Sequence, residues 1–396
     1  MSKLLPDNFA LTQRSDIQSF YDILLHTDIT SVAGLQQRLV QQDEIDTYLT
    51  EQWAWRYIRH SQHTDDADIT AAYMNWMEHI QPQRMTTNDL LSRKRITSSF
   101  VEELDESYDI LVRSTRRQIE LYREKNIPLM IEVDALNTRY DALIREKQQK
   151  NETSDEIDDI LDQMIQMRQK IATHSGYEHF AAYQFDAYGR FDYTQSDVDK
   201  FHTGIQKIVV PMLSRLHRER KIWLWVDSLQ PRDKEVDIHG WSPLRPFQRT
   251  DELISQTLTC LRAIHPLFAE QLSQMQAAGL LDLESRKHKA AGGYNCELPE
   301  TGMPFIFMNA SGTMLDVTTM VHECGPAMHN FAMNALTPHR HRAIPMEVAE
   351  VASMSMELFA LPHIAAFGLN EEEIQRYLPT KLHKNHRCTL LDIADR

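Results

Sequence analysis

The stretch that decides the fold is His322-Glu323-Cys324-Gly325-Pro326-Ala327-Met328-His329. When residues are placed every 100° around a helix, the apolar side chains in and around this stretch gather on one side. They are Val317, Val321, Cys324, Met328 and Phe331. His322, Pro326 and His329 fall on nearly the opposite side. We therefore expect a helix that is buried along one stripe and presents its polar residues to water or to a cleft.

The flanking sequence predicts where this helix begins and what precedes it. Thr313 followed by Asp316 resembles a capping box, with Asp in place of the usual Glu or Gln, so the predicted helix covers 314–335. The apolar run 303–309 lies just before it, between Gly302 and Ser311-Gly312. A short apolar run bounded by turn residues is typical of a strand.

Helical periodicity dominates the rest of the chain. Apolar residues recur with a period of 3.6 in 100–123, 157–171, 196–218, 251–263 and 346–360. The polar run 146–155 is expected to be the turn of a helical hairpin. We predict an all-α, mainly helical fold with a small β-sheet beside the helix of His322. We place an N-terminal helical region at 1–175 and the region that carries the site at 176–396.

The composition excludes several classes of protein. The chain has 396 residues, a net charge of −15 and four widely spaced cysteines. The acidic balance disfavours nucleic acid, and the cysteine spacing disfavours both a disulfide framework and a cysteine-based zinc site. No stretch approaches the ~18 apolar residues of a membrane span. The first residues contain no apolar signal segment, so we expect a cytoplasmic location and no membrane partner.

A second predicted helix carries acidic residues of the kind that bind zinc together with His. Pro345 is suited to open it, and Glu347, Glu350 and Glu357 lie along one of its faces. A His-Glu pair alone arises by chance in many chains of this length. A His followed by a Glu on a later helix supplies two of the ligand types of a His-His-Glu zinc site, which makes Glu350 a candidate ligand.

Together these motifs resemble the thimet oligopeptidase and oligoendopeptidase F family of zinc metallopeptidases. The family's active-site helix reads His-Glu-x-Gly-His, and Glu350-Val-Ala-Ser353 is similar to its Glu-x-x-Ser element. Residues 292–296 and 299–309 resemble the Gly-rich loop and edge strand that lie against a peptide substrate. The resemblance covers roughly 100–378. It implies a zincin-like oligopeptidase fold, with a channel that admits short peptides.

The resemblance also implies a role for individual residues. His322 and Glu350 would be zinc ligands, and Glu323 would be the catalytic general base. The strand 303–309 would pair with the peptide backbone by β-augmentation. The substrate-binding residues implied are Gly293, Tyr294, Phe305 and Phe307. The implied function is that of a zinc-dependent metalloendopeptidase, an oligopeptidase that hydrolyses short peptides.

One departure from the family motif concerns the metal. Pro326 stands where the family has its second zinc His, and Pro offers no donor and removes a helix hydrogen bond at a cost of ~3 kcal/mol. His329 is seven residues beyond His322, a helix rise of about 10.5 Å, which is too far for a shared ion without distortion. His339 and His341 are other conceivable donors, although a solvated basic loop is favoured there. We predict weak or absent zinc binding and impaired activity.

A second departure concerns length. Only 46 residues follow Glu350 (396 minus 350), whereas the family continues with further helices. We therefore expect the catalytic region to be truncated, with its C-terminal part missing, and the stretch 381–396 loses the family likeness. The alternatives to an impaired peptidase are a non-catalytic peptide-binding pseudo-peptidase and a non-functional fragment.

Overall fold

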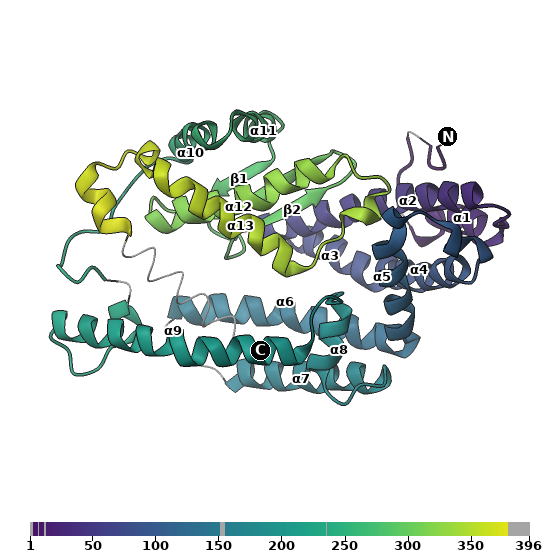
Figure 1. The fold of residues 1–396 in the computed structure, drawn as a ribbon, viewed down its shortest axis with the longest axis horizontal. Helices are drawn as coiled ribbons and strands as arrows, with labels where there is room; N and C mark the ends of the chain where they lie inside the picture. Colours follow the sequence, from purple (N-terminus) through teal and green to yellow (C-terminus); the bar gives the residue numbers. More distant parts are fainter. Residues whose placement is uncertain (1–2, 7, 12, 151–154, 235, 379–396) are drawn as a thin grey trace. The chain divides into compact units, whose positions relative to one another are not determined.

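The computed structural model describes residues 3–6, 8–11, 13–150, 155–234 and 236–378. Helices make up most of the described part, and a single sheet of three strands accompanies them there (Figure 1). The predicted mainly helical class with a small sheet is confirmed.

The chain clusters into two compact units whose segments alternate along the sequence. The first unit comprises 1–190, 286–305 and 329–348, and the second comprises 191–285, 306–328 and the residues from 349 on. The predicted functional division near residue 175 stays a prediction.

The first unit contains the helices of the N-terminal half. Its α-helices are α1 (Arg14–His26), α2 (Val32–Gln62), α3 (Ala67–Asn75), α4 (Gln81–Ile96), α5 (Asp109–Leu121), α6 (Ile127–Lys150), α7 (Asp155–His174) and α8 (Phe180–Ala187). A π-helical turn, Trp76–Ile80, joins α3 to α4. The helices α1, α2 and α4 pack around a common apolar core in which Tyr21 and Trp76 are fully buried. This core fixes the N-terminal helices in place.

Two predicted segments of the first unit differ from their observed bounds. The helix expected over 100–123 begins only at Asp109, because Asp105 caps a 3-10 turn at Glu106–Tyr108 instead. The predicted hairpin of α6 and α7 is present, and α7 confirms the helix expected over 157–171. The polar run 146–155 is helical up to Lys150, and 151–154 lie outside the described residues.

The second unit contains three further helices. They are α9 (Gln195–Trp223), α10 (Thr250–Ile264) and α11 (Pro266–Ala277). The first two confirm the helices expected over 196–218 and 251–263, and α9 continues through Pro211. The pair α10 and α11 packs together through residues such as Leu253 and Leu272, which are fully buried (Figure 1).

The sheet contains β1 (Leu281–Glu284), β2 (Tyr294–Leu298) and β3 (Met303–Ala310) in the order β1-β3-β2. Strand β1 runs parallel to β3, with Leu281 opposite Ile306 and Asp282 opposite Phe307. The strand expected over 303–309 is therefore confirmed. It is the middle strand, however, so its backbone is already paired on both sides. The prediction that 303–309 adds a substrate strand by β-augmentation is wrong, because the edges of this sheet are β1 and β2 among the residues that the structure describes.

Two helices carry the predicted site, namely α12 (Met314–Met333) and α13 (Met346–Ala360). Asp316 closes the first turn of α12, because its Oδ2 accepts the N–H of Thr313 at 2.8 Å while its own N–H donates to Thr313 Oγ1 at 3.3 Å. The predicted capping box is thus confirmed. Val317, Val321, Cys324 and Met328 are buried, which confirms most of the predicted stripe.

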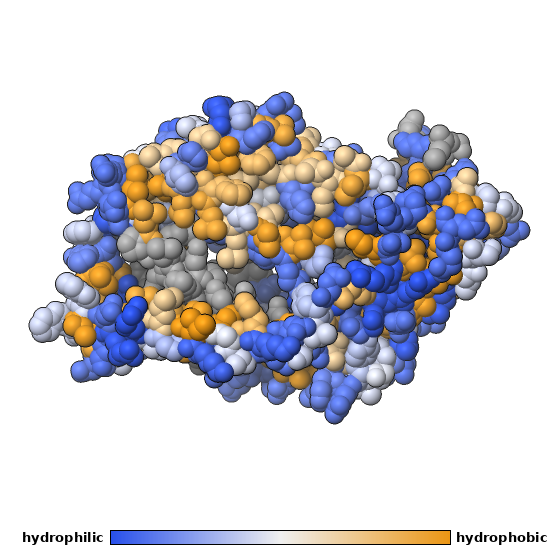
Figure 2. Space-filling model, in the orientation of Figure 1, coloured by the Kyte–Doolittle hydropathy of each residue, from blue (hydrophilic) through white to orange (hydrophobic). Residues whose placement is uncertain are grey.

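Helix α13 exposes an apolar face within the second unit. Val351, Met354, Leu358 and Phe359 are 64%, 43%, 53% and 57% exposed. In Figure 2 apolar residues gather over the part of the molecule where Figure 1 draws this helix. Within the described ranges no helix, α13 included, is long and apolar enough to cross a membrane.

Candidate active site

Gly325 brings the helices α12 and α13 into close contact. A Cβ atom built on Gly325 would lie 2.4 Å from the carbonyl oxygen of Ala352 and 2.7 Å from the Cα of Ser353. No side chain larger than hydrogen fits at such a backbone approach. The residue one helical turn before Gly325 is His322, and Glu350 lies two residues before Ala352. The close crossing therefore sets these two side chains opposite each other.

His322 lies between two carboxylates of α13. Its Nδ1 is 2.8 Å from Oε1 of Glu357, and its Nε2 is 3.5 Å from Oε2 of Glu350. Because a carboxylate can only accept here, Nδ1 carries the proton and Nε2 faces Glu350. Burial would lower the pKa of His322, but the hydrogen bond to Glu357 and the charges of Glu323, Glu357 and Glu350 raise it above its usual value.

Glu323 is the buried acid of this site. Its side chain is only 8% exposed, and burial raises its pKa to about 7, with the nearby charge of His322 lowering it and that of Glu350 raising it. A carboxyl group with a pKa near 7 can both take up and release a proton at neutral pH. The structure thus brings the three predicted residues His322, Glu323 and Glu350 together on facing helices.

Glu357 was expected on the acidic face of the second helix, without a role in the site. Residues seven apart lie two turns along the same helix face, so Glu350 and Glu357 both reach His322 from α13. The seven-residue spacing of these two acids was the sequence signal that could have identified Glu357 as part of the site. The third acid of the predicted face, Glu347, instead forms an ion pair with Arg190 in the first unit.

The predicted substrate-binding residues lie around the sheet. Gly293 precedes β2, and Tyr294 begins that strand and packs against Tyr57, with ring centroids 5.2 Å apart. Phe305 and Phe307 lie in β3 and are 2% and 0% exposed. These two phenyl rings are core side chains, so of the four residues Gly293 and Tyr294 are the accessible ones. The role of all four residues in substrate binding stays a prediction.

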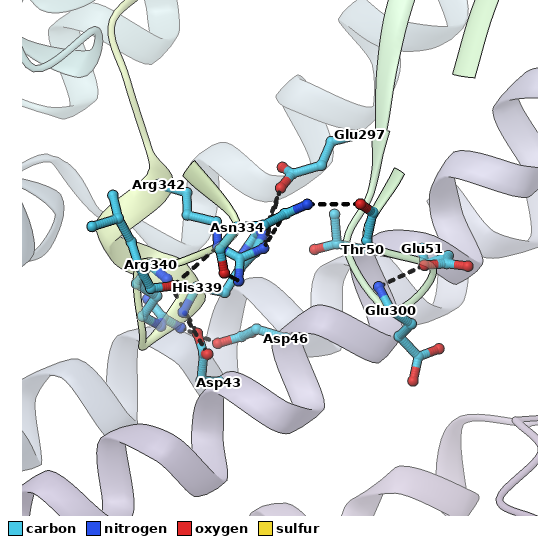
Figure 3. A network of polar contacts seen from close by, with 12 residues as sticks. Asp43, Asp46, Thr50, Glu51, Glu297, Glu300, Asn334, His339, Arg340 and Arg342 are labelled. Atoms are coloured by element: carbon cyan, nitrogen blue, oxygen red, sulfur yellow. Dashed lines mark hydrogen bonds and ion pairs between the residues drawn. The ribbon is translucent and has the colours of Figure 1, made fainter. Parts of the chain in front are cut away.

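The basic loop that carries His339 and His341 is held against α2 in the first unit (Figure 3). His339 Nε2 lies 3.0 Å from Oε1 of Glu297, and the backbone N–H groups of His339 and Arg340 donate to the Asp43 carboxylate. The expectation of a solvated loop is wrong, because buried carboxylates bind it. His341 packs edge-on against Tyr108 instead.

The donor set of α12 and α13 fits a zinc ion incompletely. A catalytic zinc takes three protein donors and keeps one open position. His322 Nε2 and the Glu350 carboxylate supply two of these donors. The Glu357 carboxylate accepts a hydrogen bond from Nδ1 of His322, as a carboxylate commonly does from the second ring nitrogen of a metal-bound His. Pro326 continues the helix without a donor. In the described part of the chain no group of three His, Cys, Asp or Glu residues is arranged to hold a metal ion.

Comparison with known proteins supports the resemblance to a metallopeptidase family. The sequence model of Peptidase family M3 matches residues 129–391. This match begins at residue 129, later than the resemblance expected from residue 100. It ends at residue 391 and so includes most of the stretch 381–396, which was expected to lose the family likeness. Residues 381–396 lie outside the described part of the chain.

Individual relatives agree with the family match. Oligoendopeptidase F (chromosomal) of Lactococcus lactis subsp. cremoris is 30% identical over 154 residues, which are 37% of this chain and 24% of that protein. The aligned part thus spans about a quarter of that relative. A crystal structure described as an oligoendopeptidase F from Bacillus anthracis str. Ames superposes with a TM-score of 0.88 at 21% identity, covering 97% of this chain and 77% of the other.

A second solved structure, PZ peptidase A with an inhibitor, superposes with a TM-score of 0.87 at 20% identity, covering 97% of this chain and 74% of the other. At such identities the two structures establish the fold, which is that of the oligoendopeptidase F proteins. The family model matches well over half of the 396 residues. The chain belongs to Peptidase family M3.

Proposed function

We propose that this chain is a zinc-dependent metalloendopeptidase that hydrolyses short peptides at the site of His322, Glu323 and Glu350. One geometric observation supports the proposal beyond family membership. The ring of His322 is clamped so that Nδ1 donates to Glu357 and Nε2 faces Glu350 at 3.5 Å. An imidazole fixed in this tautomer and orientation is what a metal-ligating His requires.

Each residue of the site has a separate task in this proposal. Glu323 would take a proton from the attacking water and later return it, for which a pKa of about 7 is well matched at neutral pH. His322 and Glu350 would hold the zinc ion, and Glu357 would orient His322. Zinc, when bound, supplies a Lewis acid for the scissile carbonyl. Because two protein donors are fewer than the usual three, weak zinc binding stays our prediction.

The substrate side of the proposal rests on the sheet. Gly293 is exposed, and Tyr294 opens the edge strand β2, where a peptide backbone could pair without displacing another strand. One solved relative is named for its complex with an inhibitor, which is consistent with a ligand-binding site in this fold. A cytoplasmic location is part of the same proposal.

The test is cleavage of a quenched fluorescent peptide by the full chain in the presence of added zinc. We expect turnover that a chelator abolishes and that Glu323→Gln lowers by ~10²–10⁴-fold, since this is the usual contribution of a general base. Glu372→Gln removes an exposed carboxylate of the same unit and should leave the rate unchanged. Turnover that survives Glu323→Gln would contradict the proposal.

A further inference from the structure

Arg95 is a buried cation whose charge is not matched by a carboxylate. It lies in the last turn of α4, in the first unit, and is only 4% exposed. Its Nη2 donates to Ser92 Oγ at 3.1 Å, whereas Nε and Nη1 have no acceptor among the residues that the structure describes. Within that same part of the chain it forms no ion pair. An isolated buried charge is strongly unfavourable, so a compensating group is expected beside it.

The carboxylate whose charge acts on Arg95 is already engaged elsewhere. Asp46 forms an ion pair with Arg340 and lies 3.8 Å from Nε of Arg84. Figure 3 shows the Asp46 carboxylate turned toward the loop of Arg340. The charge of Asp46 is therefore shared by two other cations. It does not neutralise Arg95.

Arg95 lines a small, partly open cavity between α1, α2 and α4 together with two more cations. The cavity has a volume of about 20 Å³, and its polar lining comprises Arg38, Gln42, Lys94 and Arg95. The rest of the lining is aliphatic: Leu24, Ile29, Leu35, Leu39 and Leu91. Arg95 is buried whereas Arg38 and Lys94 are partly exposed, so the positive potential that the three cations create is screened least at Arg95.

The partners of the other two cations do not cancel this potential. Lys94 Nζ donates to the backbone oxygens of Leu25 at 2.5 Å and Thr27 at 2.8 Å, and Arg38 also donates to the oxygen of Thr27. Backbone oxygens carry no net charge. The only carboxylate whose charge acts on both Arg38 and Lys94 among the described residues is the exposed Asp28.

The ionisation of these groups is consistent with an uncompensated positive field. The pKa of Arg95 is lowered to about 9, chiefly by burial and secondly by the charge of Arg340, while the charge of Asp46 opposes the change. Burial and the charge of Arg38 lower the pKa of Lys94. An anion placed among the three cations would reverse these effects, because it favours their charged forms.

We propose that this cavity is a binding site for a small monovalent anion of the halide class, held by Arg95 with Arg38 and Lys94. The size of the cavity favours a small ligand: about 20 Å³ is space for one or two water-sized particles, which suits chloride better than a tetrahedral anion such as sulfate. The anion joins α1, α2 and α4, so its effect is on the stability of the first unit. The site is independent of the proposed peptidase activity.

The test compares thermal unfolding of the full chain in sodium chloride and in sodium sulfate at equal ionic strength. Chloride is expected to raise the melting temperature saturably, and a hundredfold excess over its Kd multiplies the folding constant ~100-fold. Sulfate should give no saturable rise. Arg95→Met should abolish the chloride response. Arg93→Met, which removes a cation of the same helix that is 47% exposed and paired with Asp89, should keep it.

A measurement on the unaltered protein covers the case in which Arg95→Met fails to fold. Crystals grown in sodium bromide should show an anomalous bromide peak in the cavity, within ~3.5 Å of the guanidinium of Arg95. Equal responses to chloride and sulfate would overturn the proposal. So would a cavity that contains water and no bromide.

Discussion

The substitution Gly325→Ala tests how closely the two site helices must approach. The added Cβ would lie 2.4 Å from the carbonyl oxygen of Ala352, whereas an ordinary contact begins near 3.4 Å, so the backbones must separate by about 1 Å (3.4 minus 2.4). Overpacking costs ~1–3 kcal/mol, and here the upper half of that range applies, because the atoms approached belong to the backbone and cannot rotate away. Alanine recovers up to ~1 kcal/mol through its higher helix propensity. We therefore expect a net destabilisation of ~1–2 kcal/mol, and a His322–Glu350 contact that widens beyond its 3.5 Å.

Urea unfolding followed by circular dichroism measures the first effect, and the His322 pKa from NMR titration of the metal-free protein measures the second. That pKa should fall, since the charge of Glu350 helps to raise it. Gly204→Ala is the matched control, because Gly204 lies in α9 of the same unit with open space around its Cβ position. It should stabilise by up to ~1 kcal/mol. The reasoning fails if Gly325→Ala is as stable as the unaltered chain.

Three further outcomes follow from the site. Pro326→His should raise the zinc retained after dialysis, measured by metal analysis, since it supplies a third donor; equal zinc in both proteins would contradict this. Because burial raises the pKa of Glu323 to about 7, the folded metal-free protein keeps a proton on Glu323 that the unfolded chain loses from pH 4.5 upward, so the stability that this group contributes falls as pH rises from 4.5 to 7. Glu323→Gln should flatten this slope in unfolding experiments at each pH, and an unchanged slope would count against it. Glu357→Gln should lower the His322 pKa seen by NMR, because the Glu357 hydrogen bond and charge raise it; an unaltered pKa would disprove the clamp.

Local patterns predicted the elements of this protein well, because they depend on short-range physics. The period of apolar residues gave α12 and its buried stripe, and the Thr313–Asp316 pair gave its start. The pairing of His322 with Glu350 was also accessible, since both residues belong to a motif with a defined chemistry. The order of the strands was not, because nothing in the run 303–309 states which other segments pair with it.

The environment of charged residues was predicted wrongly where their partners are distant in the chain. The loop of His339 looked solvated because it is rich in cations, but Asp43 of α2, 296 residues away, accepts its backbone N–H. Arg95 occupies a helix end rich in basic residues, where a cation is normally an exposed partner of the helix dipole. Its burial follows only from the packing of three helices. A buried cation without a carboxylate partner therefore cannot be predicted from composition or periodicity. The fold must either tolerate its charge or bind an anion beside it. The cavity lined by Arg38, Lys94 and Arg95 favours the bound anion.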